Sequence, residues 1–320
     1  MFIQLYRQFF SHVLFIFVVL VIALNSVSAM ADNSIHRQAD TYRLKAYLQN
    51  VIQPYAYRNY QNIDELNRVS AYLKKQLEQF GLPCEYQNYL VEQKNYRNVI
   101  CHLNTGNSKK VIVGAHYDVY GNFVGADDNA SGVIGVIETA RILASNKSRL
   151  KTNVDFVFYT LEEPPYFRTE NMGSFVHAKS ILSQKDQIQA VFILEMIGFF
   201  SHQSIQEYPK GLGLFYPSHG NFIGAVSNFG SRGYATKYCE SMQSLKRLDC
   251  QKLISPSFIS GVDFSDHMNY WNQDIPAIMI TDTAFFRNKN YHTEHDTVEK
   301  LNLDKMTDVI NGVVYTILEK

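Results

Sequence analysis

The chain has 320 residues, in which 30 Lys plus Arg balance 30 Asp plus Glu and hydrophobic residues make up 46%. A chain of this length and composition can bury a large core within a single α/β domain. The balanced charge, with no basic cluster longer than Lys109-Lys110, argues against nucleic acid as a partner.

The N-terminal segment has the layout of a signal peptide. Arg7 precedes an uninterrupted apolar run over residues 13–24, and a stretch of small residues follows up to Ala31. The run is shorter than the roughly 20 residues that a helix needs to cross the hydrocarbon core. We expect residues 1–31 to be a signal peptide and 32–320 one secreted or periplasmic domain, without stable membrane insertion. An uncleaved N-terminal membrane anchor is the alternative.

Strand-like and helical segments alternate along the remaining chain. An amphipathic helix has apolar residues at helical spacing from Leu66 to Phe80, and Gly81 ends it. The later apolar runs and helical stretches are 111–115, 132–144, 154–159, 173–182, 190–194, 277–280 and 303–318. This alternation predicts a three-layer α/β/α sandwich with a mixed, mostly parallel central sheet. Residues 201–260 lack a strong period and are expected to form a rim that shapes a substrate pocket.

Four cysteines lie beyond the expected cleavage point, and an even number in an exported chain permits disulfides. Cys84 and Cys101 bracket two strand-like runs, which would bring them face to face if the runs form a hairpin. Only a short segment separates Cys239 from Cys250, which favours a second bridge. Alternatively, all four are free buried thiols.

Polar residues stand directly after several of the predicted strands, at the edge where α/β sheets bind their ligands. His116 follows the run 111–115, and Asp118 comes two residues later. A His can bind metal through one ring nitrogen while a nearby carboxylate accepts the proton on the other. Taken alone, His116 could equally be a hydrogen-bonded structural residue.

Two adjacent acids, Asp127 and Asp128, open the helical stretch that begins near Gly132. Polar residues here could simply cap the helix. Capping needs one such residue, and residues 127–131 offer four. A carboxylate with two free oxygens can bridge two cations, and crowded like charges are tolerated where a cation compensates them.

A second pair of acids, Glu162 and Glu163, follows the run 154–159 and precedes two prolines. One of the pair could bind metal while the other takes a proton from metal-bound water and passes it to a leaving amine. Glu195 ends the run 190–194 and is likewise positioned for ligation, although it could be a buried hydrogen-bond acceptor.

Near the C-terminus three histidines compete for one ligand position. Asp296 and Thr297 are expected to cap the final helix, which leaves His292 free to reach the site. His295 is then a surface residue, and His267 an outer or substrate-facing one.

The order His-x-Asp, Gly-Ala-Asp-Asp-Asn-Ala-Ser-Gly, Glu-Glu, Glu, Ser-Asp-His and Tyr-His-x-x-x-Asp-Thr, within residues 60–320, resembles the co-catalytic di-zinc exopeptidases typified by bacterial leucyl aminopeptidase. The resemblance implies two zinc ions and five ligands: His116, Asp127, Glu163, Glu195 and His292. Asp127 would bridge, with a cis bond between Asp127 and Asp128. Glu195 would share one zinc with His116, and Glu163 the other with His292. Asp118 would orient His116.

The implied function is a zinc-dependent exopeptidase, with an aminopeptidase as the main expectation. Zinc-bound water would attack the scissile carbonyl of a peptide or amino-acid derivative, with Glu162 as general base. The leucyl aminopeptidase type has Asp where this chain has Glu195, which leaves a carboxypeptidase or dipeptidase open. A glutaminyl cyclase and an inactive binding protein on the same scaffold are further alternatives. The rigid aromatic segment 164–173 is expected to line the substrate pocket.

Overall fold

The computed structural model describes residues 38–319. Within the described residues, those from 39 onward cluster as one compact unit. The predicted signal peptide, residues 1–31, lies outside the described residues. Within 38–319, none of the helices combines the length and the apolar character needed to span a bilayer.

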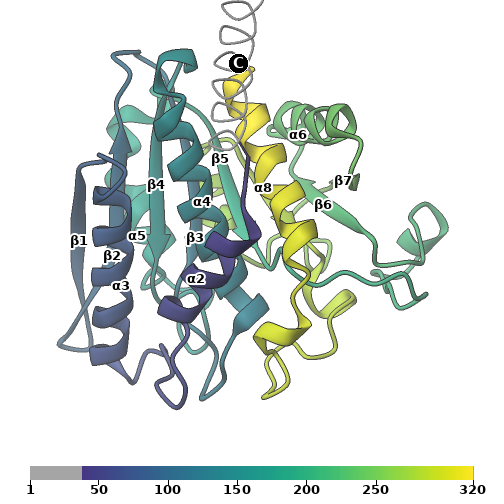
Figure 1. Ribbon diagram of the computed structural model, residues 1–320, viewed down its shortest axis with the longest axis horizontal. Coiled ribbons are helices and arrows are strands. Elements are labelled where there is room, and N and C mark those ends of the chain that lie inside the picture. Colours follow the sequence, from purple (N-terminus) through teal and green to yellow (C-terminus); the bar gives the residue numbers. More distant parts are fainter. Residues whose placement is uncertain (1–37, 320) are drawn as a thin grey trace, which may run out of the picture. The chain divides into compact units, whose positions relative to one another are not determined.

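One mixed sheet organises the described part of the chain (Figure 1). Its eight strands there are β1 (Cys84–Val91), β2 (Lys94–Leu103), β3 (Lys110–His116), β4 (Asn153–Tyr159), β5 (Ile188–Glu195), β6 (Phe222–Ser227), β7 (Asp249–Ile254) and β8 (Ala277–Thr281), in the order β1-β2-β4-β3-β5-β8-β6-β7. The four central strands β4, β3, β5 and β8 are parallel, whereas β1, β2 and the β6–β7 pair run antiparallel to their inner neighbours. The predicted mixed, mostly parallel sheet is therefore confirmed.

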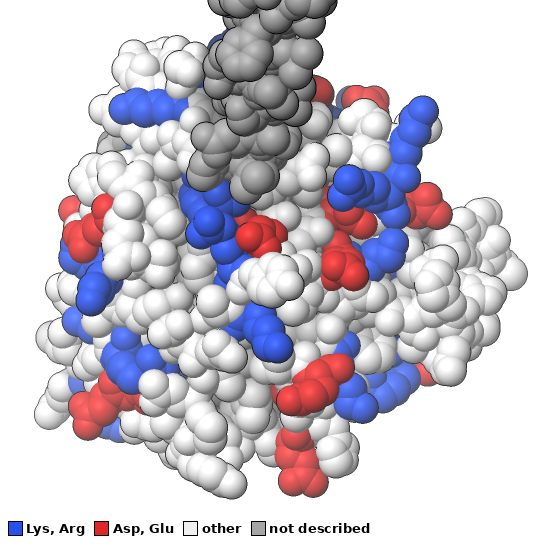
Figure 2. Space-filling model, viewed as in Figure 1, with Lys and Arg blue, Asp and Glu red and all other residues white. Residues whose placement is uncertain are grey.

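Helices cover both faces of the sheet. One face carries α2 (Thr41–Val51), α3 (Ile63–Glu78), α4 (Gly132–Ser145), α6 (Arg232–Leu245) and α8 (Leu303–Leu318), and the other carries α5 (Gly173–Ser180) and α7 (His267–Trp271). The period of two in a strand explains this division: Val111 and Val113 pack under the first set, and Ile112 packs under the second. On the face seen in Figure 2, Lys and Arg are interspersed with Asp and Glu.

The helix α3 forms as its pattern predicts. Asn62 caps it by accepting a hydrogen bond from the Glu65 N–H, and the predicted stripe of apolar residues is buried. The chain leaves the helix near Gly81, whose φ of 79° is a left-handed conformation that suits glycine.

The region 201–260 is more regular than its sequence indicates. Residues 222–254 contain β6, α6 and β7, which extend the sheet, and only the flanking segments form the expected rim. The strands here have six residues each. β7 is only partly buried and carries Asp249, Gln251 and Lys252, so its sequence shows no clear period.

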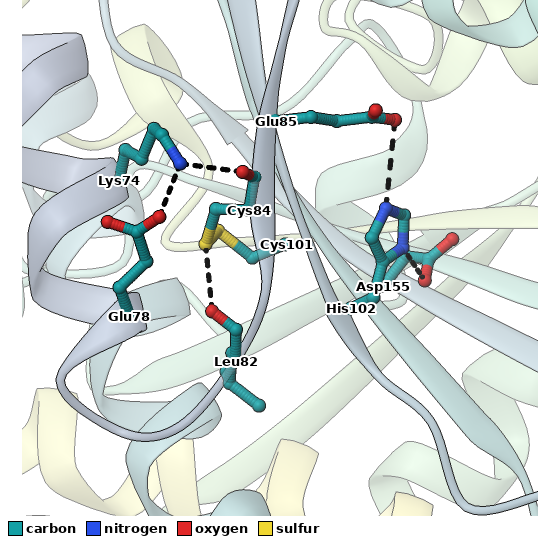
Figure 3. The surroundings of a disulfide bond; sticks show 8 residues. All are labelled: Lys74, Glu78, Leu82, Cys84, Glu85, Cys101, His102 and Asp155. Atoms are coloured by element: carbon teal, nitrogen blue, oxygen red, sulfur yellow. Dashed lines mark hydrogen bonds and ion pairs between the residues drawn. A yellow bond between two sulfur atoms is a disulfide. The ribbon is translucent and has the colours of Figure 1, made fainter.

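Both predicted disulfides are present. Cys84 and Cys101 are register partners on β1 and β2 (Figure 3), and Cys239 on α6 is bonded to Cys250 on β7. Each bridge thus ties an edge strand of the sheet to its neighbouring element.

Candidate metal centre

Two histidines and three acids meet where the parallel strands end. His116 and Glu195 are the last residues of β3 and β5, and Glu163 follows β4 closely. The Nε2 of His116 lies 3.3 Å from Glu195 Oε2 and 3.4 Å from Asp128 Oδ1. The Nε2 of His292 lies 3.1 Å from both Asp128 Oδ2 and Glu163 Oε2. Asp128 therefore offers one oxygen to each histidine.

Asp128 is the acid that faces both histidines, whereas the predicted bridging residue, Asp127, is in none of the described groups that could hold a metal ion. Asp127 points away: its Oδ1 accepts from the Gly198 N–H at 2.9 Å, and its Oδ2 accepts from Asn288 Nδ2 at 2.8 Å. The cis peptide bond likewise joins Asp128 to Asn129, not Asp127 to Asp128. Two identical acids in sequence give no sign of which one faces the centre, because the local backbone turn decides it.

Asp296 holds the turn that carries Asp128. Its two carboxylate oxygens accept the backbone N–H groups of Asp127 and Asp128 at 2.9 and 3.0 Å. The prediction that Asp296 caps the final helix is wrong, because Asn302 caps α8. The contact spans 168 residues of sequence, so no local pattern could reveal it.

Asp118 holds the second acid pair in the same way. Its Oδ1 and Oδ2 accept the backbone N–H groups of Glu162 and Glu163 at 3.2 and 3.1 Å. The Nδ1 of His116 lies 3.6 Å from Asp118 Oδ1, which is longer than a hydrogen bond. The expected orienting of His116 by Asp118 therefore stays a prediction.

Glu195 has two further partners. The Ser265 hydroxyl donates to Glu195 Oε2 at 2.7 Å, and Asn129 Nδ2 lies 3.4 Å from the same oxygen. The sequence analysis did not assign Asn129 to the centre. Its position directly after Asp127 and Asp128 was the one feature of the sequence that could have indicated this role.

Several polar atoms of this centre lack a hydrogen-bond partner. Both ring nitrogens of His116, His292 Nε2 and Glu163 Oε1 are buried and make no hydrogen bond within the described residues. The Nε2 atoms of His116 and His292 lie 3.4 and 3.1 Å from the two oxygens of Asp128. Buried polar atoms without partners are costly, and cations between the two Nε2 atoms and the neighbouring carboxylates would satisfy the atoms on that side of the rings.

Burial also shifts the pKa values of the acids in this centre. It raises the pKa of Glu163 to about 8, with a further contribution from the Asp128 carboxylate, and it raises the pKa of Glu195 as well. Burial opposes ionisation of Asp128 too, but contacts with His116 and His292 lower its pKa below the usual value. Imidazole and carboxylate groups are the ligands of zinc in hydrolases. The residues present thus fit zinc, in the groups His116–Asp128–Glu195 and Asp128–Glu163–His292.

Glu162 lies beside these groups. Its Oε2 is 4.0 Å from His116 Nε2, and it forms a third possible ligand group with His116 and Glu163. Burial raises its pKa well above the usual value.

A cavity of about 300 Å³ opens from the centre. Of the predicted pocket-lining segment 164–173, Pro164 and Phe167 line this cavity, whereas Tyr166 is buried in the core. The rim contributes Tyr208 and Tyr216.

A cluster of histidines and acids that fits metal ions, at the strand ends of a three-layer α/β/α fold, is typical of a class of metal-dependent hydrolases. The model of Peptidase family M28 matches residues 98–317, and the chain belongs to this family. It is accordingly a metallo-exopeptidase of a zinc-dependent family whose substrates are peptides.

The chain is also similar to curated proteins. The chain is 37% identical to the uncharacterized protein YfbL of Escherichia coli K12, over 94% of this chain and 95% of that one. It is 26% identical to a probable leucine aminopeptidase of Trichophyton verrucosum, over 79% of this chain and 65% of that protein, just under two thirds of its length.

Two solved structures share the fold. The Legionella pneumophila LapA aminopeptidase has a TM-score of 0.70 at 20% identity, with 88% of this chain and 71% of that chain covered. The Porphyromonas gingivalis glutaminyl cyclase has a TM-score of 0.65 at 18% identity, with 88% and 98% covered.

Proposed function

We propose that the chain is an aminopeptidase whose centre binds two zinc ions. The observation that carries this proposal is the position of Asp128, with one oxygen toward His116 and the other toward His292. Glu195 completes the ligands on the His116 side, and Glu163 completes those on the His292 side.

Zinc bound there would supply Lewis acidity and lower the pKa of a bound water. Glu162 would act as general base, accepting a proton from the attacking water and giving it to the leaving amine. Its backbone is held by Asp118, and it belongs to neither of the two groups that share Asp128.

With two zinc ions bound, the carboxylates that hold them would be compensated, and the scarcity of cations elsewhere in the cavity is what favours a substrate amine over a substrate carboxylate. Four carboxylates lie at its inner end: Asp128, Glu162, Glu163 and Glu195. Among the described residues that line it, Lys252 alone is permanently cationic, and Lys252 is exposed on β7. A carboxypeptidase would need a cation near the scissile bond to bind the terminal carboxylate.

The test compares free and N-blocked chromogenic amino-acid amides, with zinc added. We expect hydrolysis only where the amine is free. Glu162→Gln should keep its zinc and lose activity by about 10²- to 10⁴-fold. Glu170→Gln, at an exposed acid of the same loop, is the matched control and should keep activity. Equal cleavage of blocked substrates, or an active Glu162→Gln variant, would contradict the proposal.

A peptide with N-terminal glutamine belongs in the same screen, because a glutaminyl cyclase shares this fold. Release of the glutamine by hydrolysis supports the aminopeptidase. Cyclisation without release would replace it with the cyclase.

A further inference from the structure

The cavity beside the centre has an unusual floor. The helices α5 and α7 cover one face of the sheet only as far as β8, and beyond it β6 and β7 are covered on that face by loops. The cavity lies on this part of the sheet and continues to the four acids of the centre. Strand residues, and not a helix, therefore form its floor.

A glycine interrupts the row of side chains in this floor. Phe222, Gly224 and Val226 of β6 alternate toward the cavity, as does the neighbouring pair on β8, Met279 and Thr281. Gly224 is the register partner of Thr281, and Val226 is the partner of Met279. The missing side chain at Gly224 leaves a flat depression between Phe222 and Val226.

The wall of the cavity is a chain of aromatic rings that starts at the centre itself. The His292 ring stacks on Tyr291 with centroids 3.8 Å apart, and Tyr291 contacts Phe285 at 5.6 Å. Phe285 contacts Phe264 at 6.1 Å, and Phe264 contacts Phe167 at 6.1 Å. These separations are typical of favourable ring pairs, so three distant loops form one continuous surface.

Arg168 fixes the outer end of this wall. Its guanidinium lies 5.3 Å from the Phe167 centroid and 5.2 Å from that of Phe264, and it pairs with Asp263 at 2.6 Å. The Arg168 guanidinium is therefore held against the two outer rings, and the part of the aromatic wall nearer the centre remains apolar.

The described residues that form the floor and the aromatic wall carry no charge themselves, although the buried guanidinium of Arg287 lies 4.5 Å from the ring centroid of Phe222. Apart from the acids of the centre, the charged lining residues are Glu207 and Lys252, both of them exposed. Glu207 is also neutralised by Lys289 at 2.8 Å. An ammonium or carboxylate group of a substrate side chain lying over Gly224 would lose water and find no charged partner among the floor and wall residues.

We propose that this cavity selects peptides whose first residue carries a large, flat, uncharged side chain, such as Phe, Tyr or Trp, and that Gly224 determines this choice. The inference rests on the proposed aminopeptidase function, because the amine must meet the acids while the side chain enters the cavity. A ring lying over Gly224 would contact the aromatic wall edge to face.

The experiment measures kcat/KM for the free p-nitroanilides of Phe, Leu, Ala and Lys. We expect Phe to exceed Leu, and to exceed Ala and Lys by about 100-fold or more. Gly224→Val should lower the Phe-to-Ala ratio by at least about 10-fold by filling the depression. A Cβ at Gly224 would lie 3.1 Å from the Thr281 carbonyl oxygen, so the strand must give slightly. Val226→Phe is therefore a second variant that fills the same floor from a position already carrying a side chain.

Gly233→Val is the matched control, because a Cβ there meets nothing within 4 Å, and it should leave the ratio unchanged. Equal turnover of Phe, Ala and Lys substrates would overturn the selection while leaving the aminopeptidase standing. So would floor variants that lower all substrates equally. No cleavage of any free amide would overturn the aminopeptidase, and the selection with it.

Discussion

Asp127 and Asp128 are neighbours in sequence and both are buried, yet their surroundings shift their pKa values in opposite directions. Burial and the nearby carboxyl group of Asp282 raise the pKa of Asp127 well above its usual value. The two histidines lower the pKa of Asp128. Asp127 is held by hydrogen bonds within the fold, from the Gly198 N–H and Asn288 Nδ2, whereas Asp128 faces the two histidines.

This difference predicts opposite effects of the same substitution. Asp128→Asn removes the shared anionic ligand, and zinc should be lost on dialysis against a weak chelator. Asp127→Asn should retain zinc, and it should lower the free energy of unfolding by about 1–3 kcal/mol because a buried hydrogen bond is lost. Metal analysis and urea unfolding measure the two effects. Loss of zinc from the Asp127 variant alone would reverse the assignment.

His292 depends on its aromatic neighbours as well as on the acids. Its backbone has a φ of 56°, and its ring lies parallel to the Tyr120 ring with centroids 4.2 Å apart. Stacking of this kind contributes about 0.5–1.5 kcal/mol. Tyr120 therefore restricts the imidazole to the orientation in which it faces Asp128 and Glu163.

Replacing Tyr120 by Leu should weaken binding of one of the two zinc ions by about 3- to 10-fold, the equivalent of that stacking energy. Tyr120→Phe keeps the ring and should bind both ions like the parent chain. Zinc titration by calorimetry separates the two sites. A Phe variant as weak as the Leu variant would mean that the hydroxyl group matters and the stacking does not.

The sequence allowed much of this centre to be predicted, because four of its residues stand at or just beyond strand ends in a recognisable order. His116, Glu163, Glu195 and His292 are brought together as expected. The choice between Asp127 and Asp128, and the part played by Asp296, depend on backbone geometry and on contacts distant in sequence. No local pattern carries that information.

Among the elements, the β1–β2 hairpin is joined to the parallel strands by a charged cluster (Figure 3). Nδ1 of His102 on β2 lies 2.8 Å from Asp155 Oδ1 on β4. Lys110 on β3 lies 2.6 Å from the other oxygen of Asp155. The hydrogen bond to Asp155 raises the pKa of His102 above its usual value.

A raised pKa in the folded state predicts how stability changes with pH. The contribution of His102 should be complete below the unfolded pKa of about 6.5, and lost as the pH rises through the higher folded pKa. We expect roughly 0.2–1 kcal/mol, because the side chain is partly exposed and solvent screens the pair. Urea unfolding between about pH 6 and pH 9 measures the loss.

The control for this effect is His102→Gln, which should remove that part of the pH dependence. His202→Gln, at an exposed histidine, should leave it unchanged. A His102 variant with the slope of the parent chain would show that other groups cause it.

Element prediction succeeded where segments were long or strongly periodic. The helices α3 and α8 and the four central strands match their expected ranges closely. β6 and β7 were missed, because β7 is only partly buried and rich in polar residues, and β6 joins the sheet by antiparallel pairing with β8, a partner far along the chain. Pairing of this kind is decided by tertiary contacts.

In the described unit as a whole, the two disulfides lie at opposite ends of the sheet, at the strands with only one neighbour. Edge strands expose unpaired backbone groups and are the easiest to detach. The bridges close loops of 17 and 11 residues, and closing such loops stabilises a fold by about 3 kcal/mol each.

Removing either bridge should therefore lower the free energy of unfolding by about 3 kcal/mol. Cys84→Ala with Cys101→Ala removes one, and Cys239→Ala with Cys250→Ala removes the other. Urea unfolding with and without reductant provides the measurement, and a chain lacking both bridges should be insensitive to reductant. If reductant leaves the parent chain unchanged, the bridges contribute nothing to its stability.

Asp118 and Asp296 accept hydrogen bonds from the main chain of the two acid pairs. An amide N–H is the same whichever side chain its residue carries, so these hydrogen bonds do not depend on which residue stands at each position. The backbone positions at the centre are thus fixed independently of the side chains that they carry. Single substitutions during evolution could therefore change the reaction while the fold is kept, in keeping with a fold shared by an aminopeptidase and a glutaminyl cyclase.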